Sequence, residues 1–262
     1  MVGMETAQPT TKPPWLLAQR WSEILFAHWP VDAEALARQL PAGVEPDLHD
    51  GQAWIGIVAF RMVGTRPPAG PSRLTLRPIP ELNVRTYVRV RGVPGVWFLS
   101  LDASSPFFVT AGQALYGLPY RLAQMTTLVE GERVHYLSSR RSACFAASYE
   151  PCGAAAYAEP GSLEHFLVER YRLFSLRRGR LITALVAHER WPLQPATARI
   201  DVNRMAPAGL RFRGCPIVHF SASVDARISV PQPLSALQSN AWRDYATPLP
   251  PKRSRRTEPL RA

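Results

Sequence analysis

Residues Pro80–Val88 read PELNVRTYV, a segment in which polar and apolar side chains alternate. In a β-strand, successive side chains point to opposite faces of the sheet. One face of this strand therefore carries Leu82, Val84, Thr86 and Val88, and the other carries Glu81, Asn83, Arg85 and Tyr87. The apolar face belongs in a core, so the polar face lies either in water or along a polar cavity. Such a cavity is where a functional site is expected.

On both sides of this segment, the sequence predicts further strands joined by short turns. They are Ala53–Met62 after the turn Asp50-Gly51, Val84–Arg91 and Val96–Asp102 around Gly92–Gly95, Tyr120–Val129 and Arg133–Ser142 around Glu130–Glu132, Leu173–Leu176 and Leu181–His188, and residues 197–203 and 217–227. Many strands without a repeating β-α-β order predict an antiparallel barrel or sandwich.

Four segments carry helical signals. Apolar residues recur near helical spacing over residues 15–26. Asp32 is an N-cap candidate for a short helix through Leu40, and Ser105-Pro106 begins a helix that ends at Gly117. Ser162 caps a helix predicted over residues 162–174. The expected fold class is therefore mainly β (α+β), with a few helices beside the sheet.

Size and composition indicate one folded unit. The chain has 262 residues, of which 46% are hydrophobic and 19% charged, and β-rich domains of this length commonly form a single domain. We expect a loose leader over residues 1–14, a single domain over residues 15–230, and a disordered, Pro-rich basic tail over residues 231–262.

The charge distribution does not indicate a nucleic-acid partner. The net charge is +11, but the tail from Pro248 contributes +4, and the rest is spread without a basic stripe. Neither a signal peptide nor an apolar run of membrane-spanning length occurs. Cys144, Cys152 and Cys215 are odd in number and lack Cys-x-x-Cys spacing, which predicts reduced thiols. We expect a cytoplasmic protein with no membrane partner, whose oligomeric state the sequence leaves open.

Several common chemistries lack their residues. Lys12 and Lys252 are the two lysines of the chain and lie in the expected disordered ends, so no folded amine is expected to form a Schiff base. The six histidines show no metal-binding spacing, and neither a Gly-x-Ser-x-Gly motif nor a Gly-rich phosphate loop occurs. We expect no metal and no cofactor.

The polar face of Pro80–Val88 is the candidate site. Glu81 beside Pro80 is either a surface residue or a functional carboxylate, and Asn83 and Arg85 on the same face favour the second. An inward polar face needs partners and invites a bound anion or water. Asp102, at the end of the strand Val96–Asp102, is a candidate partner for Arg85.

Several motifs occur in an order that resembles the YqjF-like family (DUF2071). They are Gln19–Trp21, Phe26–Asp32, Pro80–Val88, Trp97–Asp102, Leu118–Arg121 and Glu169–Tyr171, and the resemblance covers roughly residues 15–230. That family in turn resembles acetoacetate decarboxylases, which implies a closed or nearly closed antiparallel β-barrel with an interior active site. In the decarboxylases a catalytic glutamate precedes a lysine pair.

The resemblance assigns roles to individual residues. Glu81 matches the catalytic glutamate, while the lysine pair falls on Tyr120 and Arg121, and a substrate-holding arginine falls near Pro30. The resemblance thus implies that Schiff-base decarboxylation is lost. Glu81 remains as a general acid or base, Tyr120 as a hydrogen-bond donor to a carbonyl or enolate, and Arg121 as a carboxylate ligand. A packed Tyr120 ring with a surface Arg121 is the alternative.

We therefore expect a barrel that binds a small organic carbonyl or carboxylate compound, with Glu81 as catalytic residue and Asn83, Arg85, Tyr120 and Arg121 as substrate-binding residues. Any reaction would be a lysine-independent proton transfer of the lyase or isomerase kind. A non-catalytic ligand-binding or interaction protein on the same barrel is the competing hypothesis. Nucleic-acid binding through the basic tail rests on charge alone.

Overall fold

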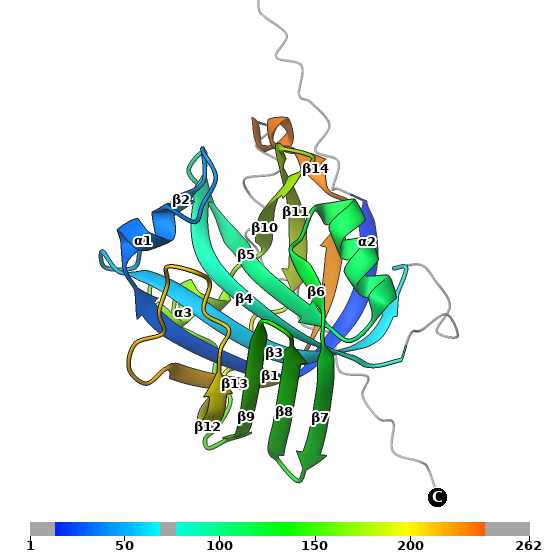
Figure 1. The fold of residues 1–262 in the computed structure, drawn as a ribbon, viewed down its shortest axis with the longest axis vertical. Coiled ribbons are helices and arrows are strands. Elements are labelled where there is room, and N and C mark those ends of the chain that lie inside the picture. The colour runs from blue at the N-terminus through cyan, green and yellow to red at the C-terminus, as the bar shows by residue number, and fades with distance from the viewer. Residues whose placement is uncertain (1–13, 69–76, 239–262) are drawn as a thin grey trace, which may run out of the picture.

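The computed structural model describes residues 14–68 and 77–238 (Figure 1). Its strands are β1 Trp15–Val31, β2 Glu45–Pro46, β3 Ala53–Arg66, β4 Ile79–Val90, β5 Val93–Ala103, β6 Tyr120–Leu122, β7 Gln124–Glu130, β8 Arg133–Arg140, β9 Ala143–Pro151, β10 Arg172–Arg177, β11 Arg180–His188, β12 Gln194–Asn203, β13 Ile217–Ser229 and β14 Gln232–Pro233. Its helices are α1 Ala33–Ala37, α2 Pro106–Tyr116, α3 Leu163–Val168 and a 3₁₀ helix Leu234–Gln238. The predicted mainly β class is confirmed.

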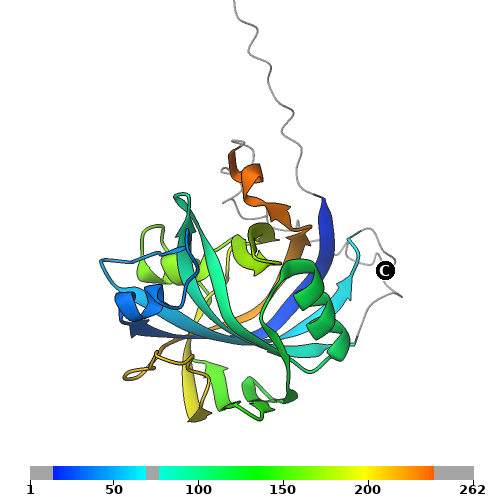
Figure 2. The same ribbon diagram turned by 45° about the horizontal axis from the view of Figure 1, so that its top comes forward.

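Seven strands of the described chain form a closed ring. Their order is β11, β10, β5, β4, β3, β1 and β13, and β13 pairs again with β11. Neighbouring strands are antiparallel, except that β10 and β5 are parallel. This ring is the counterpart of the expected barrel. Helices α2 and α1 lie on opposite sides of it (Figures 1 and 2).

A second layer covers part of the outer face of the ring. Strand β12 leaves the ring beside β13 and continues through β9, β8 and β7, which lie together at the bottom of Figure 1. Leu82 and Val84 of β4 pack in one core with Tyr136, Phe145 and Tyr149 of this layer. Strand β4 is therefore buried on both faces, with its polar face turned into the ring.

The helix expected over residues 15–26 is wrong, because this segment is the first part of the 17-residue strand β1. The strand pairs with both β3 and β13, and its register against β3 shifts between Ser22 and Leu25, where Glu23 has a φ of 50°. A bulge of this kind inserts a residue and changes the phase of the alternation. Trp21 and Ile24 consequently belong to the same inner core although they are three residues apart, a spacing that imitates a helix.

The other helix predictions hold with shifted ends. Asp32, Ser105 and Ser162 cap α1, α2 and α3 as expected. Helix α3 ends at Val168 instead of residue 174, because Leu173 and Phe174 pair with β5. The segment predicted as one strand over residues 120–129 is divided into β6, which runs parallel to β5, and β7.

Ordered structure continues past the predicted domain end at residue 230. Strand β14 pairs with β11, and Leu237 of the 3₁₀ helix is buried in a core with Val88 and Leu185. The expectation of a tail from residue 231 is therefore wrong for its first residues, and residues 239–262 lie outside the described part. No helix within residues 14–68 and 77–238 is long and apolar enough to cross a membrane.

Candidate functional site

A cavity of about 400 Å³ lies inside the ring, bounded by the inner faces of the strands and by α2. Most of its lining is apolar, including Phe26, Phe60, Leu101 and Leu118. Its polar lining includes three residues from the inward face of β4. The volume falls in the range of about 300–1,000 Å³ that is typical of small-molecule sites.

The polar residues of β4 occupy three successive layers of the ring. Glu81 lies opposite Phe60 of β3 and Ala103 of β5. Asn83 lies one layer further along, opposite Val58 and Leu101. Arg85 follows in the third layer. All three line the cavity, so the common face that the strand periodicity predicted is the one turned inward.

Glu81 and Tyr120 form a buried hydrogen-bonded pair. The Tyr120 hydroxyl donates to Glu81 Oε2 at 2.6 Å, and Glu81 is 5% exposed. Burial raises the pKa of Glu81 from its ordinary value to about 7, against the opposing effect of hydrogen bonds from Tyr120 and Asn83. Burial and the neighbouring carboxyl hold the pKa of Tyr120 well above 10. At neutral pH the pair therefore holds a carboxyl poised between its two protonation states and a hydroxyl that stays protonated.

Tyr120 is held in place by α2. The amide of Gln113 donates to the Tyr120 backbone oxygen at 2.9 Å. The ring lies directly against Gly112, where a Cβ would approach Tyr120 Cδ2 to 2.4 Å. Only glycine fits this close approach of helix and ring. The helix that Ser105 begins thus positions the hydroxyl that contacts Glu81.

Arg85 is a cation without a carboxylate partner among the described residues. Its Nη2 donates to the backbone oxygen of Leu167 at 3.2 Å, and its Nε has no hydrogen-bond partner. The guanidinium lies 5.7 Å from the centroid of the Phe26 ring and 5.8 Å from that of Tyr87. Arg85 takes part in none of the ion pairs found within the described residues.

Asp102 is not the partner expected for Arg85. Its carboxylate is fully buried and accepts hydrogen bonds from Arg140 Nε at 2.8 Å and Ser138 Oγ at 2.9 Å. Asp102 lies opposite Leu82 in the β4–β5 pair, and Leu82 belongs to the outer core. The Asp102 carboxylate therefore links β5 of the ring to β8 of the covering layer.

A buried polar network lies beside Arg85. The Tyr87 hydroxyl donates to the Leu167 oxygen at 2.6 Å and so accepts from His28 Nε2 at 2.8 Å. Burial, with a smaller effect from the charge of Arg85, holds the pKa of His28 well below its ordinary value. His28 is therefore neutral at physiological pH.

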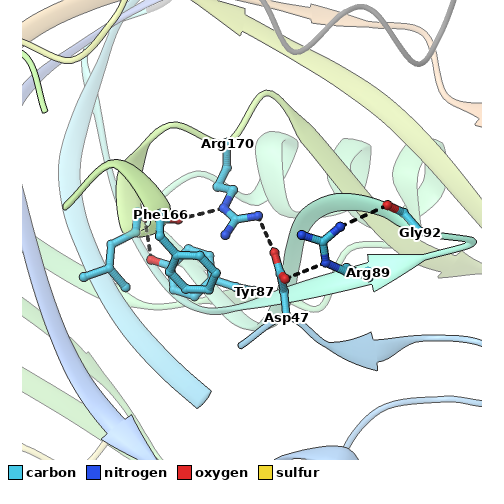
Figure 3. A network of polar contacts seen from close by, with 7 residues as sticks. Asp47, Tyr87, Arg89, Gly92, Phe166 and Arg170 are labelled. Atoms are coloured by element: carbon cyan, nitrogen blue, oxygen red, sulfur yellow. Dashed lines mark hydrogen bonds and ion pairs between the residues drawn. The ribbon is translucent and has the colours of Figure 1, made fainter. Parts of the chain in front are cut away.

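Arg170 also lines the cavity, and it packs against the Tyr87 ring (Figure 3). Its guanidinium lies between the Phe166 ring, at 4.2 Å, and the carboxylate of Asp47, at 2.7 Å. Asp47 is buried and also accepts from Arg89 Nε at 2.7 Å. Unlike Arg85, this arginine has its charge paired.

Arg121 lies outside the cavity. It is exposed, and its Nη1 donates to the backbone oxygen of Tyr120 at 3.3 Å. Adjacent strand residues point to opposite faces, so a buried Tyr120 sends Arg121 outward. From the predicted set, the cavity thus takes Glu81, Asn83, Arg85 and Tyr120.

His188 and Trp191 are among the cavity residues that the sequence reasoning missed. His188, at the end of β11, and Trp191, in the following loop, are buried and line the cavity. Burial lowers the pKa of His188 to about 4, and Trp191 Nε1 has no hydrogen-bond partner. No local motif marks these residues. They reach the cavity because β11 closes the ring against β13.

Neither a metal-binding cluster nor a lysine occurs among the residues that the structure describes. No group of three or more His, Cys, Asp or Glu residues within 14–68 and 77–238 could hold a metal ion. Both lysines, Lys12 and Lys252, fall outside those ranges. The chemistry available in the cavity is therefore that of carboxyl, hydroxyl, amide, imidazole, indole and guanidinium groups.

A seven-stranded ring with an interior cavity places the protein in the acetoacetate decarboxylase-like class of folds. The structure resembles acetoacetate decarboxylase from Legionella pneumophila with a TM-score of 0.61 and 14% identity, covering 88% of this chain and 92% of that one. It also resembles the enduracididine biosynthesis enzyme MppR complexed with pyruvate, with a TM-score of 0.59 and 15% identity, covering 88% and 93% of the two chains. At these identities, the likeness is one of fold.

Sequence similarity assigns the family. The model of DUF2071, described as an uncharacterized conserved protein, matches residues 18–225. The uncharacterized protein YqjF of Bacillus subtilis (strain 168) is 38% identical over 216 residues, which cover 80% of this chain and 89% of that protein. The chain belongs to the DUF2071 family, and the YqjF-like resemblance seen in its motifs is confirmed.

Proposed function

We propose that this protein binds a small organic compound with a carbonyl and a carboxylate group inside the ring, and that Glu81 exchanges a proton with it. The observation that supports this most strongly is the buried Glu81, whose pKa of about 7 lies near physiological pH. A general acid or base works best when its pKa is close to the working pH. Glu81 also lies in a cavity large enough for such a compound.

The unpaired charge of Arg85 supports a carboxylate ligand. A guanidinium in a largely apolar cavity is costly unless an anion compensates it, and its fork of N–H donors matches the two oxygens of a carboxylate. The described residues supply Arg85 with a carbonyl and two aromatic faces but with no carboxylate. Pyruvate, named with the structurally similar MppR, has both a carbonyl and a carboxylate group.

The proposed step is a proton transfer at the carbon beside the carbonyl. The Glu81 carboxylate takes a proton from that carbon, and the electron pair of the broken C–H bond forms the enolate. Once protonated, Glu81 no longer needs the Tyr120 hydroxyl as donor. Tyr120 then donates to the enolate oxygen, and return of the proton from Glu81 to carbon completes the exchange.

A lysine is not required for this step. Amine catalysis forms a covalent imine with the carbonyl, whereas here the carbonyl oxygen is stabilised by hydrogen bonding alone. The cavity as the described residues form it contains no lysine, since Lys12 and Lys252 lie outside those residues. The proposed reaction class is thus isomerisation or proton exchange without Schiff-base decarboxylation.

Deuterium uptake tests the proposal. The full-length protein is incubated in D₂O with a panel of oxo acids, and NMR follows deuterium at the carbon beside the carbonyl. We expect uptake with the wild type, loss of uptake with Glu81→Gln, and no change with Glu132→Gln, a matched variant in the exposed β7–β8 turn. Uptake that survives Glu81→Gln would contradict the role of Glu81.

The competing function is non-catalytic binding in the same cavity. It is favoured by the Tyr120–Glu81 hydrogen bond, which satisfies one carboxylate oxygen within the protein itself. Calorimetry on the same panel separates the two proposals. Tight binding of an oxo acid without deuterium uptake would establish a binding protein and reject the catalytic role.

A further inference from the structure

The polar groups of the cavity fall into two separate sets. Glu81 and Arg85 lie on one face of β4, four residues apart, so their Cα atoms are about 13 Å apart at about 3.3 Å per residue. Glu81 is hydrogen-bonded by Tyr120 beside α2, whereas Arg85 contacts Leu167 of α3. We call the first set the carboxyl end of the cavity and the second the guanidinium end.

The guanidinium end offers two hydrogen-bond donors that lack acceptors. Arg85 Nε and Trp191 Nε1 are both buried without a partner. Both side chains pack on Phe26, with the Arg85 guanidinium 5.7 Å and the Trp191 ring 4.9 Å from the centroid of the Phe26 ring. Two unpartnered donors beside the same ring, one of them charged, suit the two oxygens of a carboxylate.

The space between the two ends is mostly apolar. The intervening layer carries Asn83 together with Val58, Leu101 and Phe26. Asn83 is 4% exposed, and its Oδ1 has no partner. A ligand that spans this layer must therefore present hydrocarbon to three of these side chains, with room for at most a single donor toward the amide oxygen.

From this arrangement we infer that the cavity takes an elongated oxo acid. Its carboxylate lies at Arg85 and Trp191, its carbonyl lies at Glu81 and Tyr120, and an apolar chain or ring of several carbons separates them. In pyruvate the carbonyl is bonded to the carboxylate carbon, and in a 3-oxo acid a single methylene separates them. Neither kind of compound can reach both ends at once. This inference rests on the proposed function and names its substrate class.

A pair of ligands of different length tests the inference. The short probe is 4-oxopentanoate and the long probe is 7-oxooctanoate, and calorimetry measures the dissociation constant of each with the full-length protein. At about pH 6, where Glu81 is largely protonated and Tyr120 is free to donate to the carbonyl, we expect the long probe to lose at least about tenfold in affinity with Arg85→Gln and also with Tyr120→Phe, as charge-assisted and buried hydrogen bonds are removed. The short probe should respond to one variant but not to both.

Controls distinguish binding at both ends of the cavity from the affinity that a longer hydrocarbon chain adds by itself. The methyl ester of the long probe lacks the charge and should be nearly indifferent to Arg85→Gln. Trp191→Phe removes the Nε1 donor while keeping an aromatic ring, and serves if Arg85→Gln does not fold. Arg38→Gln, in an exposed position directly after α1, is the matched surface control.

The two hypotheses fail in different ways. If no oxo acid of either length binds, the proposed function itself is rejected. If the short probe binds as tightly as the long one, or is weakened by both Arg85→Gln and Tyr120→Phe, the elongated class is rejected while the proposed function stands. Affinity of the long probe that is unchanged in both Arg85→Gln and Trp191→Phe would also overturn the inference.

Discussion

Glu81→Gln should remove a pH-dependent cost to folding. The pKa of Glu81 is about 7 in the folded protein, against an ordinary value of 4.5. The folded state therefore holds this proton more tightly than the unfolded chain, so stability is fully present below about pH 4.5 and is lost as pH rises through about 7. At about 1.4 kcal/mol for each tenfold change in the ionisation constant, the loss above pH 7 is about 3 kcal/mol. A neutral glutamine does not ionise and escapes this loss.

Urea unfolding of both proteins at several pH values between about 4.5 and 9 measures the effect. The free energy of unfolding of Glu81→Gln, relative to wild type, should rise by about 3 kcal/mol across this range. Any constant difference from the altered Tyr120 contact does not depend on pH and leaves the slope intact. Glu132→Gln should run parallel to wild type. Parallel profiles for Glu81→Gln and wild type would refute the burial argument.

Three further substitutions test the framework around the cavity. Asp47→Ala should cost about 3–5 kcal/mol of stability because it leaves the buried Arg170 charge uncompensated, whereas Arg89→Ala, which removes the half-exposed partner, should cost less than about 1 kcal/mol. Equal losses of thermal stability would contradict this assignment. Gly112→Ala should displace the Tyr120 ring from Glu81 and lower the free energy of unfolding by about 1–3 kcal/mol. The hydrogen bond from Tyr120 lowers the pKa of Glu81. Carbon-13 NMR of Gly112→Ala should therefore show the Glu81 carboxyl titrating above pH 7, and an unchanged midpoint would disprove the positioning role of Gly112.

Local sequence patterns predicted much of the sheet and the helix starts. The alternation in Pro80–Val88, the turn at Asp50-Gly51 and the caps Asp32, Ser105 and Ser162 all act through neighbours a few residues away. Where a long-range contact intervened, the same reasoning failed. The bulge near Glu23 gave β1 a helix-like apolar spacing, and pairing with β5 ended α3 early.

The sequence by itself determined that Glu81, Asn83 and Arg85 share one face of a strand, because strand periodicity is a property of the chain. Only the tertiary structure decided that this face turns inward, that Arg140 takes Asp102 while Arg85 stays without a carboxylate, and that Trp191 joins the cavity. These outcomes depend on ring closure between β11 and β13 and on the layer that covers β4. Both bring together residues far apart in sequence, and no local pattern encodes such contacts.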